Sequence, residues 1–477
     1  MTAPSPLSAL AEMPPWLTAP TASTDFVSAL TTVVPELADG RIGVTSCKPK
    51  LRLKSDRPGW SVSYDVGLVG PDHAPREVRL TGTFMPPGLS GRSVNGEAPA
   101  TATGIFATPG WTGSFPALGL EVETETADDA LPALGDLIDP VAARALLEDA
   151  IRGVGRPDFT LGSARPDIRR YKPGSRCTIF YELGYGAGSD GPVAVVAKTY
   201  RGTKGLNAFE GMSALWDTGI SQRGIVGLAE PLAYLSDSRV LVQACVPENQ
   251  TLKELVREAV GGGDADVATR LRAAIAQTAT GLAALHTSGV VHGETVTWDD
   301  ECQEIAELCD RLRPLLPQVA QAADDLRSAL EVQANIEPAD PAVTAHRSFR
   351  PAQVLLGDQD VSFIDFDGLC MAEPALDVAL FRASLRDAGT RGYVETGHSG
   401  YGDLDSTLDF LDDLADHFLE RYQAQATVSG ERVRLWEALD QITSALHCWT
   451  KIKPDRLAVR VRVLERRLTA TDAQASG

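Results

Sequence analysis

Basic residues, aromatic residues and paired cysteines are all scarce in this chain. Lys and Arg number 44 against 64 Asp and Glu, a formal charge of −20, so the average surface repels nucleic-acid backbones and anionic lipids. Aromatic residues make up only 6% of the chain, which does not indicate a surface for stacking sugars or single-stranded bases. The seven cysteines are scattered and form no CxxC pair, which argues against a disulfide framework and against a zinc site.

Long apolar runs are also missing. No stretch reaches the roughly 18 apolar residues that a membrane helix needs. The N-terminal sequence MTAPSPLSALAEMPPW has neither the basic nor the apolar region of a signal peptide. We therefore expect a cytoplasmic protein with neither nucleic acid nor a membrane as a partner.

What is present is an ordinary globular composition, with 43% hydrophobic and 23% charged residues over a length of 477. That length predicts roughly two to four compact units. The acidic surface would suit a cationic substrate, but it is also a common way for a protein to stay soluble. Both interpretations stay open.

The order of sheet-type and helix-type patterns predicts an α+β protein. Residues 1–23 are rich in Pro, Ser, Thr and Ala and predict a flexible arm, and residues 466–477 predict a flexible tail. Between them we expect a β-rich N-terminal unit over 24–140, a mixed β lobe over 141–248 and a helical lobe over 249–465.

The β-rich N-terminal unit and the lobe after it share a pattern. Starting at Phe26 and at Val141, each reads as an amphipathic helix, two strands, a strand ending in Tyr-acid-apolar-Gly, and a further alternating strand. In this comparison the second copy has Lys198 where the first has Gly82. The first unit is therefore a possible degenerate repeat of the second, with a chance likeness between two hairpins as the alternative.

The strongest concentration of polar residues is the segment HRSFRPAQVLLGDQDVSFIDFDGLCMAEPALDVALF, which starts at His346. It predicts a hairpin whose second strand delivers Asp365 and Asp367 at its end, on one side. Carboxylates that leave a buried strand need a cation, and Mg²⁺ bridging nucleotide phosphates would supply one. Alternatively, one of the two aspartates caps the following turn.

This segment resembles the catalytic core of the aminoglycoside phosphotransferase and choline kinase-like superfamily. Members of that superfamily carry an H-x-D-x-x-x-x-N loop followed by a strand ending in I-D-[FW]. On that pattern His346 takes the place of the loop histidine, Ser348 of the catalytic Asp, and Gln353 of the metal-binding Asn. Asp365 takes the place of the metal-binding Asp, and Asp377 of a structural Asp at the start of a helix.

The resemblance implies a two-lobed protein kinase-like fold, ATP and Mg²⁺ as cofactors, and a small-molecule hydroxyl as the acceptor. Gln353 can still offer an amide oxygen to a metal, one methylene farther out. Ser348 is the larger departure, because serine has neither the charge nor the pKa of a general base, and losing that base slows transfer by about 10²–10⁴. Asp367 could substitute for it, or Ser348 could itself accept phosphate.

The mixed lobe supplies further expected site residues. Lys198 stands on a strand in VAVVAKTY, and the resemblance implies that it contacts nucleotide phosphates with Glu210 as its ion-pair partner. As an alternative, Lys198 is an edge residue with its ammonium group in water. The turn that contains Gly174 and Ser175 resembles a phosphate-covering loop.

The strand VLVQACV resembles the hinge that contacts adenine through its backbone. The residues concerned are Gln243, Ala244, Cys245 and Val246. Any buried strand would show a similar pattern, so this assignment depends on the resemblance.

Two hypotheses follow. The first is an ATP- and Mg²⁺-dependent phosphotransferase that acts on a small molecule. The second is a pseudokinase that binds nucleotide, or none, and works as a scaffold for a protein partner. Ser348 favours the second, whereas the joint presence of Lys198, Glu210 and Asp365 favours the first.

Overall fold

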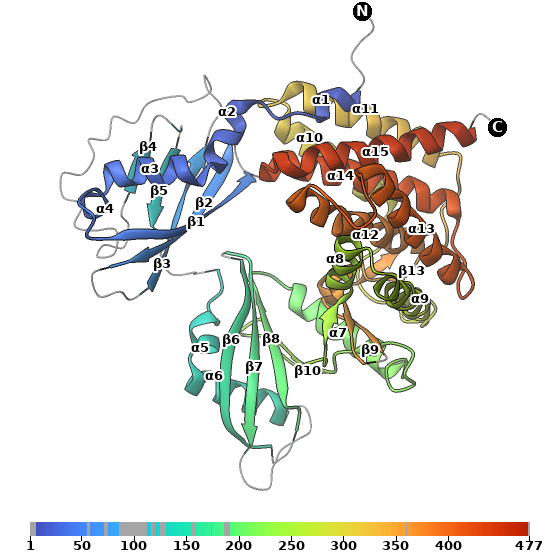
Figure 1. Ribbon diagram of the computed structural model, residues 1–477. Helices are drawn as coiled ribbons and strands as arrows, with labels where there is room; N and C mark the ends of the chain where they lie inside the picture. The colour runs from blue at the N-terminus through green and yellow to red at the C-terminus, as the bar shows by residue number, and fades with distance from the viewer. Residues whose placement is uncertain are drawn as a thin grey trace, which may run out of the picture. The chain divides into compact units, whose positions relative to one another are not determined.

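The computed structural model describes residues 6–54, 58–70, 75–84, 112–115, 118, 120–124, 130–153, 159–172, 174–185, 191–358 and 360–475. The chain divides into two compact units (Figure 1). Unit 1 comprises Met1–Ala127, Glu301–Val332 and Gln441–Gly477, and unit 2 comprises Asp128–Asp300 and Gln333–Asp440.

Unit 1 begins with short helices and a sheet. The helices are α1 (Pro6–Leu10), α2 (Pro15–Thr18), the 3₁₀ turn η1 (Ala19–Thr21), α3 (Ser23–Val33) and α4 (Pro35–Ala38). The strands are β1 (Gly43–Leu53), β2 (Trp60–Val69), β3 (Pro75–Phe84), β4 (Thr112–Phe115) and β5 (Leu120–Thr124). They pair in the order β1-β2-β3-β5-β4.

Alternation along β2 builds the core of this sheet. Trp60, Val62, Tyr64 and Leu68 are buried, with half-buried serines between the first three of them. Phe26 of α3 stacks on Tyr64 with the ring centroids 3.5 Å apart. Such aromatic pairs add about 0.5–1.5 kcal/mol beyond the area they bury, so α3 is fixed to one face of the sheet.

The predicted flexible arm over residues 1–23 contains short helices where the structure describes it. Leu10, Leu17 and Pro20 are buried, and the Trp449 indole N–H donates to the Leu10 carbonyl at 3.2 Å. Trp16 packs edge-on against Trp60 at 6.4 Å. Apolar anchors spaced along the segment thus outweigh its Pro- and Ser-rich composition.

Unit 2 contains the mixed β lobe. Its elements are α5 (Leu134–Ile138), α6 (Pro140–Gly153), β6 (Leu161–Lys172), β7 (Arg176–Tyr185), β8 (Ala194–Tyr200), α7 (Lys204–Asp217), β9 (Gly227–Leu228), β10 (Pro231–Leu235) and β11 (Val240–Ala244). The five-stranded sheet has the order β10-β11-β8-β7-β6. Inward residues of its strands pack on α6 in one core that contains Leu147, Ile179, Tyr181, Ala197 and Val242.

A largely helical part completes unit 2. Its elements are β12 (Gln250–Thr251), α8 (Leu252–Gly262), α9 (Ala265–His286), β13 (Val343–Ala345), η3 (Pro351–Gln353), β14 (Val354–Leu356), β15 (Val361–Phe363), η4 (Phe366–Gly368), β16 (Cys370–Ala372), α12 (Pro374–Thr396) and α13 (Leu404–Gln423). Its helix ends are specified locally. Thr251 and Glu254 form a capping box on α8, and Gly263 ends that helix with φ at +63°.

Four more helices lie wholly or partly within the predicted helical lobe over 249–465. They are α10 (Trp298–Leu312), α11 (Pro317–Ala334), α14 (Gly430–Lys451) and α15 (Pro454–Ala475). Most of α10, α11 and α15 and the second half of α14 belong to unit 1, so the predicted lobe 249–465 is not one continuous unit. The predicted tail 466–477 is helical as far as Ala475, because α15 continues through it.

The two five-stranded sheets are alike in detail. Both place the three strands that follow the helix side by side, and both then cross over to a later hairpin. Tyr64 donates to the Pro20 carbonyl at 2.9 Å and Tyr181 to the Leu137 carbonyl at 2.6 Å, each across 44 residues. Leu137 also shows that unit 2 begins before the predicted boundary at 141. We propose that the sheets are two copies of one structural unit.

Strand register corrects one detail of that comparison. Tyr64 pairs with Leu80 and Tyr181 with Val195, which makes Thr83, rather than Gly82, the counterpart of Lys198. Thr83 accepts a hydrogen bond from Lys54 Nζ at 2.5 Å. The first sheet therefore carries a hydroxyl where the second carries an ammonium group.

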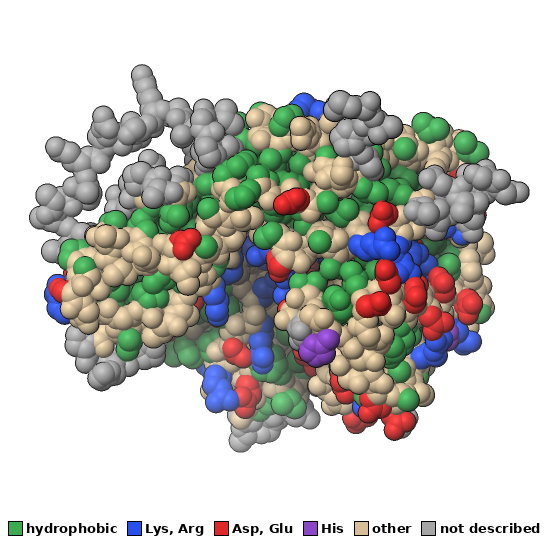
Figure 2. Space-filling view, turned by 45° about the horizontal axis from the view of Figure 1, so that its top comes forward, with side chains coloured by type: hydrophobic (Ala, Val, Ile, Leu, Met, Phe, Trp, Pro, Cys, Tyr) green, Lys and Arg blue, Asp and Glu red, His purple; other side chains and the backbone are tan. Residues whose placement is uncertain are grey.

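The surface and the remaining composition give few further constraints. On the face drawn in Figure 2, acidic and basic side chains lie among one another rather than in one acidic patch.

All seven cysteines are described, and none forms a disulfide. In the described part of the chain no helix is long and apolar enough to span a membrane, and no group of three His, Cys, Asp or Glu side chains is arranged to hold a metal.

Candidate active site

The middle of the unit 2 sheet presents a basic face. Lys198 of β8 lies opposite Thr178 of β7 and Leu241 of β11. Its neighbour Ala197 points into the core shared with α6, so Lys198 and Tyr200 point to the other face. The alternation of strand residues therefore brings an ammonium and a phenol to one side of the sheet.

Two carboxylates from the helical part meet this face. Lys198 Nζ lies 2.8 Å from Asp365 Oδ1 and 3.3 Å from Asp367 Oδ1. Arg176 Nη1 lies 2.7 Å from Asp367 Oδ2 and 3.9 Å from Asp365 Oδ1. The Tyr200 hydroxyl donates to Asp367 Oδ1 at 2.7 Å. Two cations thus face two anions in a partly buried cluster, with 9% of the Lys198 side chain exposed.

The cluster changes the protonation of its members. Burial works against ionisation of Asp365, but the Lys198 ammonium outweighs burial and holds the pKa of Asp365 well below its usual range. Burial alone would lower the pKa of Lys198, and the carboxylates of Asp367 and Asp365 raise it instead. Burial, followed by the charge of Asp367, raises the pKa of Tyr200 well above its usual value. Lys198 is therefore charged and Tyr200 neutral at physiological pH.

The sequence predicted that a strand delivers the two aspartates at its end. In the structure they lie in a turn that follows the strand. β15 ends at Phe363, and Asp365 has left-handed backbone angles of φ +72° and ψ 50°. Asp367 lies in the following 3₁₀ turn, η4. Asp tolerates the left-handed region better than most residues, so the chain can bend sharply here and bring both carboxylates to the same cations.

Hydrogen bonds to buried groups hold the loop that starts at His346. The His346 N–H donates to Asp377 Oδ2 at 2.5 Å, and His286 Nε2 lies 3.2 Å from the same oxygen. His346 Nε2 lies 3.0 Å from the Ile364 carbonyl oxygen, and its Nδ1 lies 3.2 Å from Ser348 Oγ. The structural role expected for Asp377 thus has a physical basis in these hydrogen bonds.

Gln353 lies in η3, next to the strand that leads to Asp365. Its carbonyl accepts from the Ile364 N–H at 3.1 Å, which ties the two chain segments together. Its side-chain oxygen Oε1 is buried and has no hydrogen-bond partner in the described part of the protein. A buried oxygen without a partner is costly, so Gln353 has an acceptor to offer to a cation.

The turn between β6 and β7 lies close to the cluster. Gly174 has φ at +66°, a value that favours glycine, and the Ser175 N–H closes the turn on the Lys172 carbonyl at 3.1 Å. Pro173 lies outside the described residues. The turn leads directly into Arg176, whose guanidinium binds Asp367.

The expected hinge follows the last residues of β11. Gln243 pairs with Val196 on the same face as Lys198, and its side-chain Oε1 is buried without a partner among the described residues. The Ala244 N–H donates to Glu230 and the Cys245 N–H to Ala194. In the described part of the chain the Val246 N–H has no backbone acceptor, which leaves it available to a ligand.

Glu210 does not take its expected place. It is exposed on α7, where Ala208, Gly211 and Met212 form the buried side of the helix. Among the described residues Lys198 pairs with Asp365 and Asp367 instead. Helix phase explains the difference, because a shift of one residue moves a side chain by about 100° around the helix.

Two members of the cluster, Arg176 and Tyr200, were missed in the sequence. Arg176 pairs with Tyr200 across β7 and β8, two residues beyond the pair of Thr178 with Lys198. Residues two apart on a strand share a face, so Tyr200 could have been inferred from Lys198. Arg176 required the register of the hairpin, which depends on where the turn begins.

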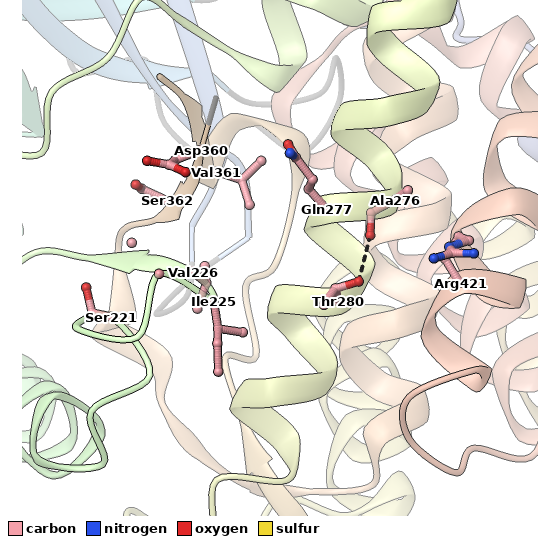
Figure 3. A pocket seen from close by; sticks show the side chains of 12 residues that line it. Ser221, Ile225, Val226, Ala276, Gln277, Thr280, Asp360, Val361, Ser362 and Arg421 are labelled. Atoms are coloured by element: carbon pink, nitrogen blue, oxygen red, sulfur yellow. Dashed lines mark hydrogen bonds between the residues drawn. The ribbon is translucent and has the colours of Figure 1, made fainter. Parts of the chain in front are cut away.

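A separate cavity of about 320 Å³ lies between β9, β15 and α9 (Figure 3). The labelled side chains include Ile225, Val226, Gln277 and Arg421, and Thr280 donates to the Ala276 carbonyl at 3.1 Å. Neither Lys198 nor Asp365 is among the residues that line it. The chemistry of the charged cluster therefore lies elsewhere in unit 2.

Comparison with known proteins shows similarity to one family over part of the chain. Residues 220–414, less than half of the chain, match a family model described as the phosphotransferase enzyme family. None of the curated proteins compared with the sequence matches it.

Among solved structures the chain is similar to three phosphotransferases at low identity. Choline kinase LicA from Streptococcus pneumoniae is 14% identical with a TM-score of 0.41, over 61% of this chain and 89% of that one. A glucosamine kinase in complex with glucosamine, ADP and inorganic phosphate is 16% identical with a TM-score of 0.45, over 96% and 99%. Spectinomycin phosphotransferase APH(9)-Ia is 12% identical with a TM-score of 0.40, over 69% and 94%.

The matched segment contains the loop at His346, the amide of Gln353 and both aspartates of the cluster. The resemblance predicted from the sequence is confirmed over these residues, and the predicted mixture of helices and sheets is confirmed by the structure. Over residues 220–414, the chain is therefore similar to the phosphotransferase enzyme family.

Proposed function

We propose that the protein is an ATP- and Mg²⁺-dependent phosphotransferase that transfers a phosphoryl group to a hydroxyl of a small molecule. The observation that carries this proposal is the approach of Lys198 Nζ to Asp365 Oδ1 at 2.8 Å, across 167 residues of sequence. A cation for phosphates and a carboxylate for metal are the two groups that phosphoryl transfer needs side by side.

The residues present fit a hard metal ion. Asp365 is ionised, and Gln353 Oε1 is a buried oxygen without a partner among the described residues. Oxygen ligands of this kind are the ones that Mg²⁺ prefers. When bound, the metal would neutralise charge on the transferring phosphate. Asp367 already forms an ion pair with Arg176 and accepts a hydrogen bond from Tyr200, so we place it behind Asp365 as a metal ligand.

The same face of the sheet fits a nucleotide. Lys198 and Arg176 supply two cations for phosphate oxygens, and the Val246 N–H and the orphan oxygen of Gln243 lie at the hinge end of the sheet. The backbone of Gly174 and Ser175 forms the turn above the cations. Each cation would exchange a carboxylate partner for a phosphate when nucleotide binds, since both anions are acceptors of similar geometry.

The acceptor hydroxyl needs orientation and a place for its proton. His346 and Ser348 stand where the superfamily has its loop histidine and its base. Positioning and electrostatics contribute most of the rate of phosphoryl transfer, so Ser348 slows the reaction without removing it. The acidic net charge and the small-molecule acceptors of the superfamily are compatible with a cationic acceptor, which we include in the proposal.

The pseudokinase hypothesis is the competing proposal, because Arg176 and Lys198 together neutralise both aspartates without any ligand. Thermal unfolding with and without ATP and Mg²⁺ separates nucleotide binding from its absence, since a ligand that binds only the folded protein raises Tm. We expect a rise for the wild type at millimolar ATP and its loss in Lys198→Met. No rise with Mg²⁺ or Mn²⁺ would reject nucleotide binding in favour of a scaffold role.

A further inference from the structure

The hydroxyl of Ser348 has a proton acceptor built beside it. The Ile364 carbonyl can only accept, so the His346 Nε2 that lies 3.0 Å from it carries the hydrogen. In the neutral ring Nδ1 is then unprotonated and can only accept. The single hydrogen of Ser348 Oγ has two acceptors within reach, Nδ1 at 3.2 Å and the Asp365 carbonyl oxygen at 3.5 Å, and Nδ1 is the nearer of the two.

The imidazole is fixed in this tautomer and orientation. His346 is fully buried, and its ring packs against Phe366 and Phe349 with centroids 4.8 and 5.6 Å away. Its backbone N–H is held by Asp377. A hydroxyl bonded to an imidazole that a third group orients is the arrangement that activates a serine nucleophile.

This hydroxyl also stands beside the metal and phosphate groups. Ser348 Oγ lies 3.5 Å from the backbone oxygen of Asp365, whose carboxylate binds Lys198. Ser348 is half-buried and not enclosed, so its oxygen can be reached from the site. A nucleophile with its own base thus lies where a phosphoryl group would be transferred.

We propose that Ser348 is itself a phosphate acceptor, which rests on the proposed use of ATP at this site. The bond that forms joins Ser348 Oγ to the γ-phosphorus of ATP, and the bond that breaks joins that phosphorus to the oxygen bridging it to the β-phosphate. ADP leaves with the bond's electron pair, and the proton of the serine passes to His346 Nδ1.

The modification is intramolecular and limits itself. Each chain carries one Ser348, and a phosphoserine adds about 1.5 to 2 negative charges at neutral pH. This charge lies beside the imidazolium that the reaction creates and close to Asp365. The phosphate would fill the position of an acceptor hydroxyl, so the modified protein would no longer transfer to a small molecule.

The test is the intact mass of the full chain, first treated with a phosphatase and then incubated with ATP and Mg²⁺. We expect the wild type to gain the mass of one phosphoryl group, and peptide mapping should locate that group at Ser348. The first-order rate constant of the mass gain should not depend on protein concentration. Ser348→Ala should gain none. Ser288→Ala, which removes a half-buried hydroxyl that only accepts from the Val290 N–H at 3.3 Å, should behave as the wild type.

A second variant tests the base. His346→Asn cannot take the proton, and we expect the rate of mass gain to fall by about 10²–10⁴-fold while the serine remains. The Tm of each variant shows whether it is folded and whether ATP with Mg²⁺ still raises it. A phosphoryl group on another residue, or an unchanged rate in His346→Asn, overturns the proposal.

The outcomes separate this inference from the proposed function. A wild type whose Tm rises with ATP and Mg²⁺, and which phosphorylates a small molecule, but never gains mass, would overturn the inference and keep the function. In that case Ser348 would only relay a proton from the acceptor to His346. A wild type with neither a Tm rise nor a mass gain overturns both.

Discussion

Arg176 and Asp367 are 191 residues apart in the sequence and are joined by a 2.7 Å bond from Nη1 to Oδ2. The arginine begins β7, directly after the turn that contains Gly174, and the aspartate lies in η4, four residues after the end of β15. Their bond therefore connects the two lobes of unit 2 through the middle of the candidate site. Nucleotide phosphate would compete with Asp367 for the same guanidinium.

Replacing Arg176 by Met should destabilise the protein by about 1.5–3 kcal/mol, the usual range for a hydrogen bond to a charged group. The side chains of Arg176 and Asp367 are 26% and 11% exposed, so solvent screens the pair only partly. Urea unfolding of the variant measures the loss.

Arg165→Met is the matched control for that experiment. Arg165 is also a strand arginine with a carboxylate partner, Glu182, but the two side chains are 77% and 58% exposed. A change within about 0.5 kcal/mol is expected at such a surface site. Equal losses in the two variants would contradict the importance assigned to the Arg176–Asp367 bond.

The stability of the cluster should depend on pH in a defined direction. Because the folded pKa of Asp365 is lowered, its contribution is fully present above the ordinary Asp pKa of about 3.9 and is lost as pH falls toward the folded value. Because the folded pKa of Lys198 is raised, its contribution is fully present below about 10.4 and is lost as pH rises through the folded value.

The difference in unfolding free energy between the wild type and Asp365→Asn should therefore be constant from about pH 5 to 9 and shrink below about pH 4. Urea unfolding at a series of pH values measures it. Asp237→Asn, at an exposed turn, supplies the control and should show little difference at any pH. A difference that grows as pH falls below about 4 would contradict the ion pair.

Local patterns predicted the strand that carries Lys198 and the hairpin that precedes Asp365, and the resemblance implied that both residues belong to one site, although it paired Lys198 with Glu210. Arg176 escaped prediction because its partner depends on hairpin register and on how two lobes face each other, which no local pattern encodes. Glu210 was predicted wrongly because the motif does not determine helix phase. Strand register also decides that the position in the first sheet equivalent to Lys198 is Thr83 and not Gly82.

The first 23 residues and the helices of unit 1 show the other limit of the sequence. Composition indicated a loose arm, but Leu10 and Leu17 are buried, and the Leu10 carbonyl accepts a hydrogen bond from Trp449, which is 439 residues away. The helical pattern over 249–465 included the residues of α10 and α11, but it did not indicate the sheet-containing unit to which most of both helices belong. Long-range packing decides both.

Replacing Gln353 should change the Mg²⁺ concentration that ATP binding requires. If its orphan oxygen is a metal ligand, Gln353→Leu removes a buried group that has no partner in the described structure, so stability without metal should stay the same or rise. The concentration of Mg²⁺ needed for ATP to raise Tm should increase by at least about tenfold, the lower end of the usual effect of weakening a metal site.

Gln353→Asn is the control, because it keeps the amide and restores the shorter side chain of the superfamily motif. Its Mg²⁺ requirement should be equal to or lower than that of the wild type. Thermal unfolding at fixed ATP over a Mg²⁺ titration measures both variants. An unchanged Mg²⁺ requirement in Gln353→Leu would remove Gln353 from the metal site.

The replacement Ser348→Asp most sharply divides the phosphotransferase from the pseudokinase. The new carboxylate would stand where the superfamily places its acceptor-orienting base, beside His346 Nδ1 and the backbone oxygen of Asp365. ATP binding, measured as a rise in Tm, should be preserved. Turnover, measured as ADP release with a panel of small-molecule alcohols, should stay the same or rise by up to about 10²–10⁴-fold. Asp365→Ala should abolish turnover in either background, because it removes the expected metal ligand and leaves Lys198 with Asp367 as its remaining carboxylate partner. A protein that binds ATP, releases no ADP with any acceptor, and gains no turnover from Ser348→Asp would falsify the phosphotransferase hypothesis and favour the pseudokinase hypothesis.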